Sequence, residues 1–478
     1  MKTDQEPHIT LRYSPWLALV VVAIGYFMNV LDSTVVNVAV PSIITGLHMS
    51  TDGVLWVING YLLPYALLLL VAGRLGDLYG HRNVFFAGLL AFTVASVLCG
   101  VAHTPGELIA ARVLEGVGAA AASPQAVAIT SAIFPPARRG LAFGTLAGVV
   151  GVASVAGPAL GGVVTNYLGW RWIFFLNVPF GLIGLAGTFV FVPATRNAVR
   201  QRLRPGTVVL STLGLFAILF ALIEGQRFGW GRLWGVLTIP SLLVVGPILL
   251  VVVALVERAG AESLLPRALF NRRNYALMVW AATALSFGIF GAQLVMTIYL
   301  QLAVHASPLR TGLLQAPMWL AATLVSPVGG RLSDQIGRRP VLVCAFGLFG
   351  LGVAVAGVMA RAGLSWALFI TPLVFAGLGA GFIFGPMPAT AMAEVEPHMA
   401  GGASAMIETA RQVGGAIATA VVGAILLSIG HPGPASGVAL FVTAAVLGVA
   451  AVSCLLIRAT PHVAVPERRG ERHQDALA

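Results

Sequence analysis

Charged side chains are scarce in this sequence. Only 9% of its 478 residues are Asp, Glu, Lys or Arg, whereas 58% are hydrophobic and the mean hydropathy is +0.92. A soluble globular domain carries roughly 25% charged residues. A chain with so few charges cannot cover a water-facing surface, so the composition predicts an integral membrane protein.

Lysine and cysteine are also nearly absent, and this excludes several kinds of chemistry. Lys2 is the only lysine, so the phosphate-binding loop G-x-x-x-x-G-K-[ST] of a nucleotide-driven pump is excluded. Cys99, Cys344 and Cys454 each lie inside a hydrophobic run, which indicates no disulfide framework. No Cys or His pair has zinc-ligand spacing, and no nucleophile–base pair stands out. We therefore expect no metal, no cofactor and no enzymatic activity.

Hydrophobic runs of about twenty residues dominate what is present, and each is long enough to cross a bilayer as a helix. The first, at 16–36, is too long for a signal-peptide core and lacks a small-residue cleavage site, so we expect a permanent span. The sequence predicts an all-α integral membrane protein with about fourteen transmembrane helices, at roughly 16–36, 54–72, 84–102, 107–131, 141–164, 172–193, 206–223, 234–256, 275–297, 312–330, 341–360, 366–388, 402–428 and 437–458.

Basic residues are distributed unevenly among the loops. Five of the 28 lie in loops on one side of the membrane and two lie within spans, whereas the rest fall in the tails and the remaining loops. Dense clusters occur at 138–139, 196–204 and 258–273. Because basic loops stay in the cytoplasm, both termini are predicted to be cytoplasmic. This placement also accounts for the net charge of +11 without nucleic acid as a partner.

One ten-residue phrase occurs twice. Residues 73–82 read G-R-L-G-D-L-Y-G-H-R and residues 330–339 read G-R-L-S-D-Q-I-G-R-R, after the second and the tenth predicted span. The repetition predicts two related halves that rock against each other, as in a transporter. The expected division is an N-terminal six-helix half at 1–195, a linker with two extra helices at 196–272, a C-terminal six-helix half at 273–460 and a cytoplasmic tail at 461–478.

The acids inside the two phrases, Asp77 and Asp334, are predicted to lie in short cytoplasmic loops among arginines. An acid there either caps the next helix or pairs across the two halves. We expect a gating contact, whereas a plain loop ion pair, worth little energy, is the alternative. The expected gating residues are Asp77, His81, Arg82, Asp334, Arg338 and Arg339.

Charged residues inside the predicted spans are costly and are the best candidates for function. Two pairs are separated by three residues and share a helix face, and each is either a neutralising salt bridge or a carboxylate that exchanges a proton as access alternates. The energy for transport is expected to come from an ion gradient or from the substrate's own gradient. The candidates for proton coupling or substrate binding are Asp32 in the first span, Arg112 and Glu115 in the fourth, and Glu408 and Arg411 in the thirteenth.

Asp32 is the favoured proton or cation site among these residues. It has no arginine within one helical turn, so desolvation is expected to dominate its environment. The alternatives are that Asp32 is hydrated at the outer interface, or that it caps a helix break near Pro41.

The fifth predicted span is rich in glycine. Small residues four apart let helices approach closely, and a proline can kink a helix. We expect a bent helix at the seam between the halves, whereas ordinary small-residue packing is the alternative. The expected interface residues are Gly157, Pro158, Gly161 and Gly162.

Taken together, these residues resemble the major facilitator superfamily over essentially the whole chain. The two phrases resemble its signature loop, residues 108–120 its fourth-helix motif, and residues 157–162 the fifth-helix motif associated with antiporters. Residues 31–41, L-D-S-T-V-V-N-V-A-V-P, and 170–179, W-R-W-I-F-F-L-N-V-P, resemble the fourteen-span drug:H⁺ antiporter family, often called DHA2.

The resemblance implies proton-driven export of drugs, antibiotics or related amphiphiles across the cytoplasmic membrane, by a protein expected to be a monomer. It assigns Asp32 to coupling or substrate recognition and Arg112 to proton transfer. It also assigns Asp77 and Arg82 to the inner gate, and Gly157 with Pro158 to the interface between the halves. A dedicated exporter of a self-made metabolite or lipid, and a membrane sensor or scaffold that moves nothing, are the alternatives.

Three positions depart from the family pattern. His81 stands where the first loop usually has arginine, so that contact is expected to be weaker or pH-sensitive. Glu115 stands where glutamine is common, which adds a second titrating site. Ala153 replaces the first glycine of the fifth-helix motif.

Overall fold

The computed structural model describes residues 14–194, 205–234, 237–256, 267–306, 308–363, 366–429 and 432–458. Within these ranges the chain is helical apart from turns and one short β hairpin. The arginine cluster at 196–204, residues 258–266 of the cluster at 258–273 and the tail at 461–478 lie outside the described residues. The side on which the two chain ends lie therefore stays a prediction.

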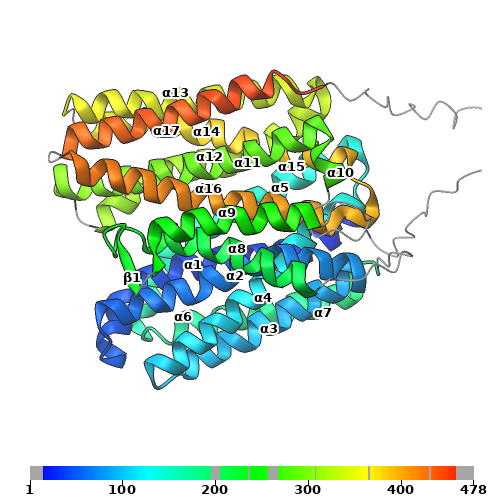
Figure 1. The fold of residues 1–478 in the computed structure, drawn as a ribbon, viewed down its shortest axis with the longest axis horizontal. Coiled ribbons are helices and arrows are strands. Elements are labelled where there is room, and N and C mark those ends of the chain that lie inside the picture. The colour runs from blue at the N-terminus through cyan, green and yellow to red at the C-terminus, as the bar shows by residue number, and fades with distance from the viewer. Residues whose placement is uncertain are drawn as a thin grey trace, which may run out of the picture.

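The first bundle consists of six membrane-crossing units, the last of which is broken in two. Figure 1 shows most of these helices, in blue to cyan, in its lower part, whereas α5 lies higher, beside helices of the second bundle. They are α1 Pro15–Leu47, α2 Thr51–Tyr79, α3 His81–Val101, α4 Pro105–Ile133, α5 Arg139–Tyr167 after the short turn η1 Pro136–Arg138, and α6 Trp172–Phe175 continued by α7 Asn177–Phe191.

The second bundle repeats this arrangement and lies above the first in Figure 1. Several of its units begin or end with a short turn of tighter or wider helix. They are α11 Arg273–Ile298 with the π-helical turn η2 Tyr299–Ala303, α12 Pro308–Ile336, α13 Arg338–Arg361, η3 Trp366–Phe369 with α14 Ile370–Phe384, α15 Pro386–Ala391 and η4 Met392–Glu394, then η5 Pro397–Met399 with α16 Ala400–Ser428, and α17 Pro432–Cys454.

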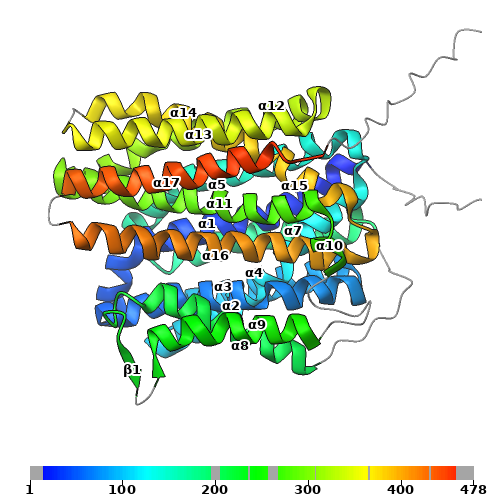
Figure 2. The same cartoon turned by 45° about the horizontal axis from the view of Figure 1, so that its top comes forward.

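Two inserted helices stand between the bundles, α8 Pro205–Glu224 and α9 Ile239–Val256. An antiparallel hairpin of β1 Arg232–Trp234 and β2 Leu237–Thr238 joins them, and the short α10 Arg267–Phe270 follows. Leu215 and Leu219 of α8 pack against both α2 and α16, so the insertion covers the line where these two helices meet (Figure 2).

Thirteen helices in the described part of the chain are long and apolar enough to cross a membrane. The remaining long helix is α12, which has 29 residues and contains Pro317 and Pro327. It is the least apolar of the long helices, yet it packs between α5 and α14 within the two-bundle assembly. With α12 counted, the structure confirms the predicted all-α membrane fold of about fourteen spans.

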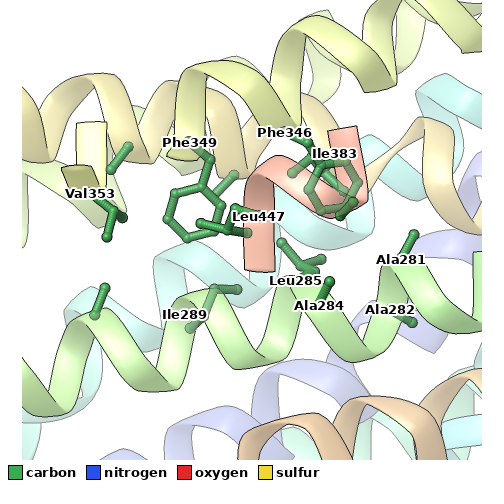
Figure 3. Packing of buried hydrophobic residues seen from close by; sticks show 14 of the residues in the cluster. Ala281, Ala282, Ala284, Leu285, Ile289, Phe346, Phe349, Val353, Ile383 and Leu447 are labelled. Atoms are coloured by element: carbon green, nitrogen blue, oxygen red, sulfur yellow. The ribbon is translucent and has the colours of Figure 1, made fainter. Parts of the chain in front are cut away.

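Each bundle has its own hydrophobic core. In the second bundle, Phe346 and Phe349 of α13 pack against Leu285 and Ile289 of α11 and Leu447 of α17 (Figure 3). Two further clusters fill the first bundle, formed mainly by residues of α1 to α7. Because a lipid bilayer drives no hydrophobic collapse between helices, such dense side-chain packing is what holds each bundle together.

Glycines set how closely α3 and α4 approach. A Cβ atom built on Gly118 of α4 would lie 2.5 Å from the backbone nitrogen of Phe92 and 2.8 Å from the carbonyl oxygen of Gly88, both in α3. Such contacts are shorter than real Cβ atoms show, and the obstacles are backbone atoms that cannot rotate away. The two helices can therefore adopt this spacing only because Gly118 has no side chain.

We predict that Gly118→Ala lowers the free energy of unfolding by about 1–3 kcal/mol through overpacking. Gly448→Ala is the matched control, because nothing lies within 4 Å of a Cβ atom at that position. The control is expected to leave stability unchanged or raise it slightly. Thermal unfolding of both purified variants in detergent checks this, and equal melting temperatures would contradict the proposed close packing.

Candidate functional site

A buried arginine with two carboxylates forms the centre of the first bundle. The Arg112 NH1 group of α4 donates to Asp32 Oδ2 of α1 at 2.6 Å and to Glu115 Oε2 at 2.7 Å. The three side chains are 2% exposed or less. The predicted pair of Arg112 and Glu115 is therefore confirmed. We call Asp32, Arg112 and Glu115 the buried triad.

Asp32 has no arginine within one helical turn, yet its partner Arg112 comes from another helix, 80 residues further along the chain. Both alternatives for Asp32 are wrong, because its side chain is buried rather than hydrated and because Pro41 lies inside α1 rather than at a break. Hydropathy along one helix does not reveal which residue of another helix faces it.

Helix α2 completes the surroundings of Arg112. The guanidinium Nε donates to the carbonyl oxygen of Val57 at 3.2 Å, and its carbon Cζ lies 4.4 Å from the ring centroid of Tyr61. An aromatic face attracts such a cation most strongly where water is excluded. Gly116 of α4 touches the backbone of Tyr61 so closely that a side chain would overlap it, which brings α2 within reach of the arginine.

Two polar residues for which the sequence predicted no role join the buried triad. The Ser96 hydroxyl of α3 donates to Glu115 Oε1 at 2.5 Å. The Asn177 Nδ2 group lies 3.4 Å from both Asp32 Oδ1 and Ser96 Oγ. Asn177 is the first residue of α7, directly after the break that follows α6. For Asn177, the signal available in the sequence was an uncharged polar residue within a predicted span.

A second charged cluster lies where the bundles meet. Arg411 NH1 donates to Glu408 Oε2 at 3.0 Å within α16, so this predicted pair is also confirmed. Tyr65 of α2 donates its hydroxyl to Glu408 Oε1 at 3.0 Å, and Gln412 lies 3.5 Å from the same oxygen. Arg411 keeps 29% of its side chain exposed, and its Nε group has no hydrogen-bond partner among the described residues.

The two repeated acids each cap a helix of the opposite bundle. Asp77 accepts from the backbone nitrogens of Gly401 and Gly402, the second and third residues of α16, at 2.8 and 3.0 Å. Asp334 accepts from those of Gly140 and Leu141 near the start of α5, at 3.3 and 3.1 Å. We call the end of the assembly that carries these contacts the repeat end.

One expectation about these acids needs correction. Asp77 lies in the last turns of α2 and Asp334 in those of α12, so neither stands in a loop. Of the two alternatives, capping the next helix and a contact across the halves, the structure shows the second, because each acid caps a helix of the other bundle. The N-terminus of a helix carries partial positive charge, so a carboxylate stabilises it and at the same time joins the two bundles.

The basic residues of the two phrases differ in what they contact. His81 lies with Nδ1 2.8 Å from Gln125 Oε1 and with Nε2 3.8 Å from Asp77 Oδ1. Arg338 donates to the carbonyl oxygens of Ala389 at 2.9 Å and of Pro136 at 3.1 Å, and the latter contact crosses between the bundles. In the described structure Arg82 and Arg339 form no ion pair, and Arg339 is exposed.

The glycines of α5 meet two different partners. Gly140 touches Gly330 and Gly144 touches Ser326, both in α12 of the other bundle. The predicted interface residues lie further along, where Gly157 touches Thr34 and Gly161 touches Val35 of α1. The interface prediction is therefore wrong for these two glycines in this conformation. Gly162 has nothing within 4 Å, and Pro158 lies within α5 beside them.

We predict that Asp77→Asn weakens the contact at the repeat end, since a neutral amide accepts less strongly from the α16 backbone. Ser404 lies at this contact: it is 1% exposed and donates to the carbonyl oxygen of Pro124 in the other bundle. Its exposure to solvent therefore rises when the contact opens. In protein whose three native cysteines are alanine, a Ser404→Cys thiol should react about fivefold faster with maleimide in the Asp77→Asn variant. Glu396→Gln, which removes an exposed acid, is the control. An unchanged rate would contradict the bridging role of Asp77.

Comparison with known proteins agrees with this architecture. The family model described as the Major Facilitator Superfamily matches residues 22–290 and 278–477. The chain is 37% identical to the puromycin resistance protein of Streptomyces alboniger, over 86% of this chain and 81% of that protein. It is 32% identical to the tetracenomycin C resistance and export protein of Streptomyces glaucescens, over 88% and 78% of the two chains.

A solved structure shares the fold at low sequence identity. The human organic anion transporter MFSD10 superposes with a TM-score of 0.64 at 14% identity, covering 93% of this chain and all of that one. The likeness in structure extends over both bundles, and the sequence relatives span most of the chain as well. The chain belongs to the Major Facilitator Superfamily.

Proposed function

We propose that the chain exports small amphiphilic compounds, such as drugs or antibiotics, across the cytoplasmic membrane in exchange for protons. The observation that carries this proposal is the buried triad, in which one guanidinium faces two carboxylates away from water. A charged group inside a membrane protein is costly and is kept where it serves ion or substrate movement. Relatives named for puromycin resistance and for tetracenomycin C export support the direction of transport.

The triad is suited to hold and release a proton. Arg112 keeps its charge, so with both carboxylates ionised the site carries an excess negative charge in surroundings of low polarity. Binding one proton on Asp32 or Glu115 removes that excess. Loss of the proton to one side of the membrane and its return from the other then accompany the exchange of conformations.

Glu408 is the residue that we propose meets the substrate. It lies on α16 of the second bundle and is bonded to Tyr65 of the first, so a ligand held there contacts both bundles. A carboxylate beside an aromatic hydroxyl suits a protonated amine on an apolar body. The exposed part of the Arg411 guanidinium offers a donor to an oxygen of the same ligand.

The repeat end is proposed to be the cytoplasmic gate. Positive residues favour the cytoplasmic side for the loops there, and both chain ends are proposed to lie on that side. Opening the gate requires that Asp77 and Asp334 leave the helix ends of the opposite bundle. The rocking units are proposed to be residues 1–195 and 273–460 of a monomer, with the insertion at 196–272 between them.

A dedicated exporter of a self-made metabolite is the second candidate, and the relative named for both resistance and export of tetracenomycin C favours it. Such a protein would use the same triad and the same gate and would differ only in the lining around Glu408. A sensor or scaffold that moves nothing has no use for three buried charges, and catalysis is not part of the proposal.

We predict that Asp32→Asn abolishes substrate-driven proton movement. The triad then loses one of the two carboxylates that Arg112 bridges, and with it the excess negative charge that binds a proton. Purified protein in liposomes with an imposed pH gradient and an interior pH dye is given puromycin or tetraphenylphosphonium. Glu107→Gln, an exposed acid at the start of α4, is the control and should behave as wild type. Proton movement that persists in Asp32→Asn would shift coupling to Glu115 or Glu408.

We predict that Glu408→Gln raises the KM for tetraphenylphosphonium about tenfold, since a charge-assisted contact to the cation is lost. Glu394→Gln, which changes an acid beside α15 outside the proposed site, is the matched control. Flux measured over a range of probe concentrations separates KM from kcat. A fall in kcat at unchanged KM would place Glu408 in proton coupling instead.

A further inference from the structure

The two carboxylates of the buried triad are bridged on two sides. Arg112 joins Asp32 Oδ2 to Glu115 Oε2, with 2.6 and 2.7 Å to its NH1 group. The other oxygen of each carboxylate, Asp32 Oδ1 and Glu115 Oε1, faces Asn177 and Ser96, and these two residues lie 3.4 Å from each other. The five side chains therefore close a ring in which one bridge is a fixed cation and the other is neutral.

The neutral bridge holds an unused acceptor. Asn177 is 1% exposed, and its Oδ1 atom has no hydrogen-bond partner among the described residues. Buried amide oxygens are rarely left unbonded in native proteins. With the amide as placed, only its Nδ2 group serves the ring, as a donor to the ionised Asp32 Oδ1 and to Ser96 Oγ. A half-turn of the amide brings the acceptor to the same place.

The Ser96 hydroxyl can likewise act either as a donor or as an acceptor. Ser96 donates to Glu115 Oε1 in the structure, yet a serine oxygen also accepts, and its hydrogen rotates to suit its neighbours. Asn177 and Ser96 can thus each face a carboxylate as donors or a protonated carboxyl group as acceptors. Arg112 lacks this ability, because a guanidinium carries only donors.

We propose that Asn177 and Ser96 are positioning residues through which Asp32 and Glu115 share one transported proton; this rests on the proposed proton coupling. With the proton on Asp32 Oδ1, the carboxyl group donates to Asn177 Oδ1 after the amide turns. With the proton on Glu115 Oε1, the amide keeps the orientation seen in the structure, so its Nδ2 group donates to the ionised Asp32 Oδ1 and the Glu115 carboxyl group donates to Ser96 Oγ. Only the proton changes its covalent partner, so charge and atoms balance.

The remaining neighbours do not offer a second reversible bridge. Cys99 of α3 lies with its sulfur 3.5 Å from Glu115 Oε2, the oxygen that Arg112 already binds. The Tyr61 ring of α2 lies against Arg112, and Phe174 of α6 lies 5.9 Å from the same guanidinium carbon. These are the titratable, charged and aromatic groups that the described structure places around the ring.

Infrared difference spectroscopy of the full-length protein between acidic and alkaline pH tests the shared proton without any substrate. The band of the protonated carboxyl group is expected to change in both Asp32→Asn and Glu115→Gln, because the proton belongs to both. It is expected to shift toward the frequency of a weakly bonded carboxyl group in Asn177→Leu and in Ser96→Ala. A band that is lost in one acid variant and unaltered in the other would show a proton on a single residue and overturn the proposal.

Two matched controls separate this effect from a general loss of packing. Thr188→Val in α7 and Thr93→Val in α3 remove buried hydroxyls that bond only to carbonyl oxygens of their own helices. Both controls should leave the band where it is in the wild type. A shift of the same size in the controls, or none in Asn177→Leu and Ser96→Ala, would contradict the role of the bridge.

Transport by the same variants supplies the second readout. Asn177→Leu and Ser96→Ala should lower pH-driven puromycin flux at least fivefold, while exchange of labelled for unlabelled puromycin without a pH gradient stays within twofold of wild type. Equal loss of both activities would make the residues merely structural and overturn the proposal. Absence of puromycin exchange in the wild type would count against the proposed function alone, because the infrared result stands without it.

Discussion

A guanidinium that keeps its charge must be paired wherever it is buried, and Arg112 imposes this constraint on three helices of the first bundle. It lies on α4 and takes its partners from α1, from its own helix and from the backbone of α2. Breaking such a set by removing one partner leaves an unpaired charge, which costs far more than the pair itself contributes. The three helices are therefore held in one register by a single side chain.

Helix α2 connects the places where function is proposed. Its residues Val57 and Tyr61 contact Arg112, Tyr65 bonds to Glu408, and Asp77 caps α16 near the repeat end. Because the three contacts lie along one helix, a displacement of α2 changes all three sites together. The internal repeat gives α12 and α5 the reciprocal contact through Asp334, so the two bundles hold each other at two related points.

The fold followed from the sequence because its signals are local. Hydrophobic runs of bilayer length and a ten-residue repeat predict spans and two bundles without knowledge of any contact. The pairs Arg112–Glu115 and Glu408–Arg411 were predictable for the same reason, since three residues on a helix fix their distance. Asp32 and Asp77 were placed less well, because their partners lie 80 and 324 residues away and depend on how the helices are arranged.

The central claim is that the buried triad carries the proton that substrate displaces. The most direct measurement adds substrate to purified protein in a weakly buffered solution and records proton release with a pH indicator, while binding is followed separately. The account predicts that the wild type releases a proton on binding and that the Asp32→Asn/Glu115→Gln double variant binds without release. Equal release from the double variant would show that the proton comes from elsewhere in the protein.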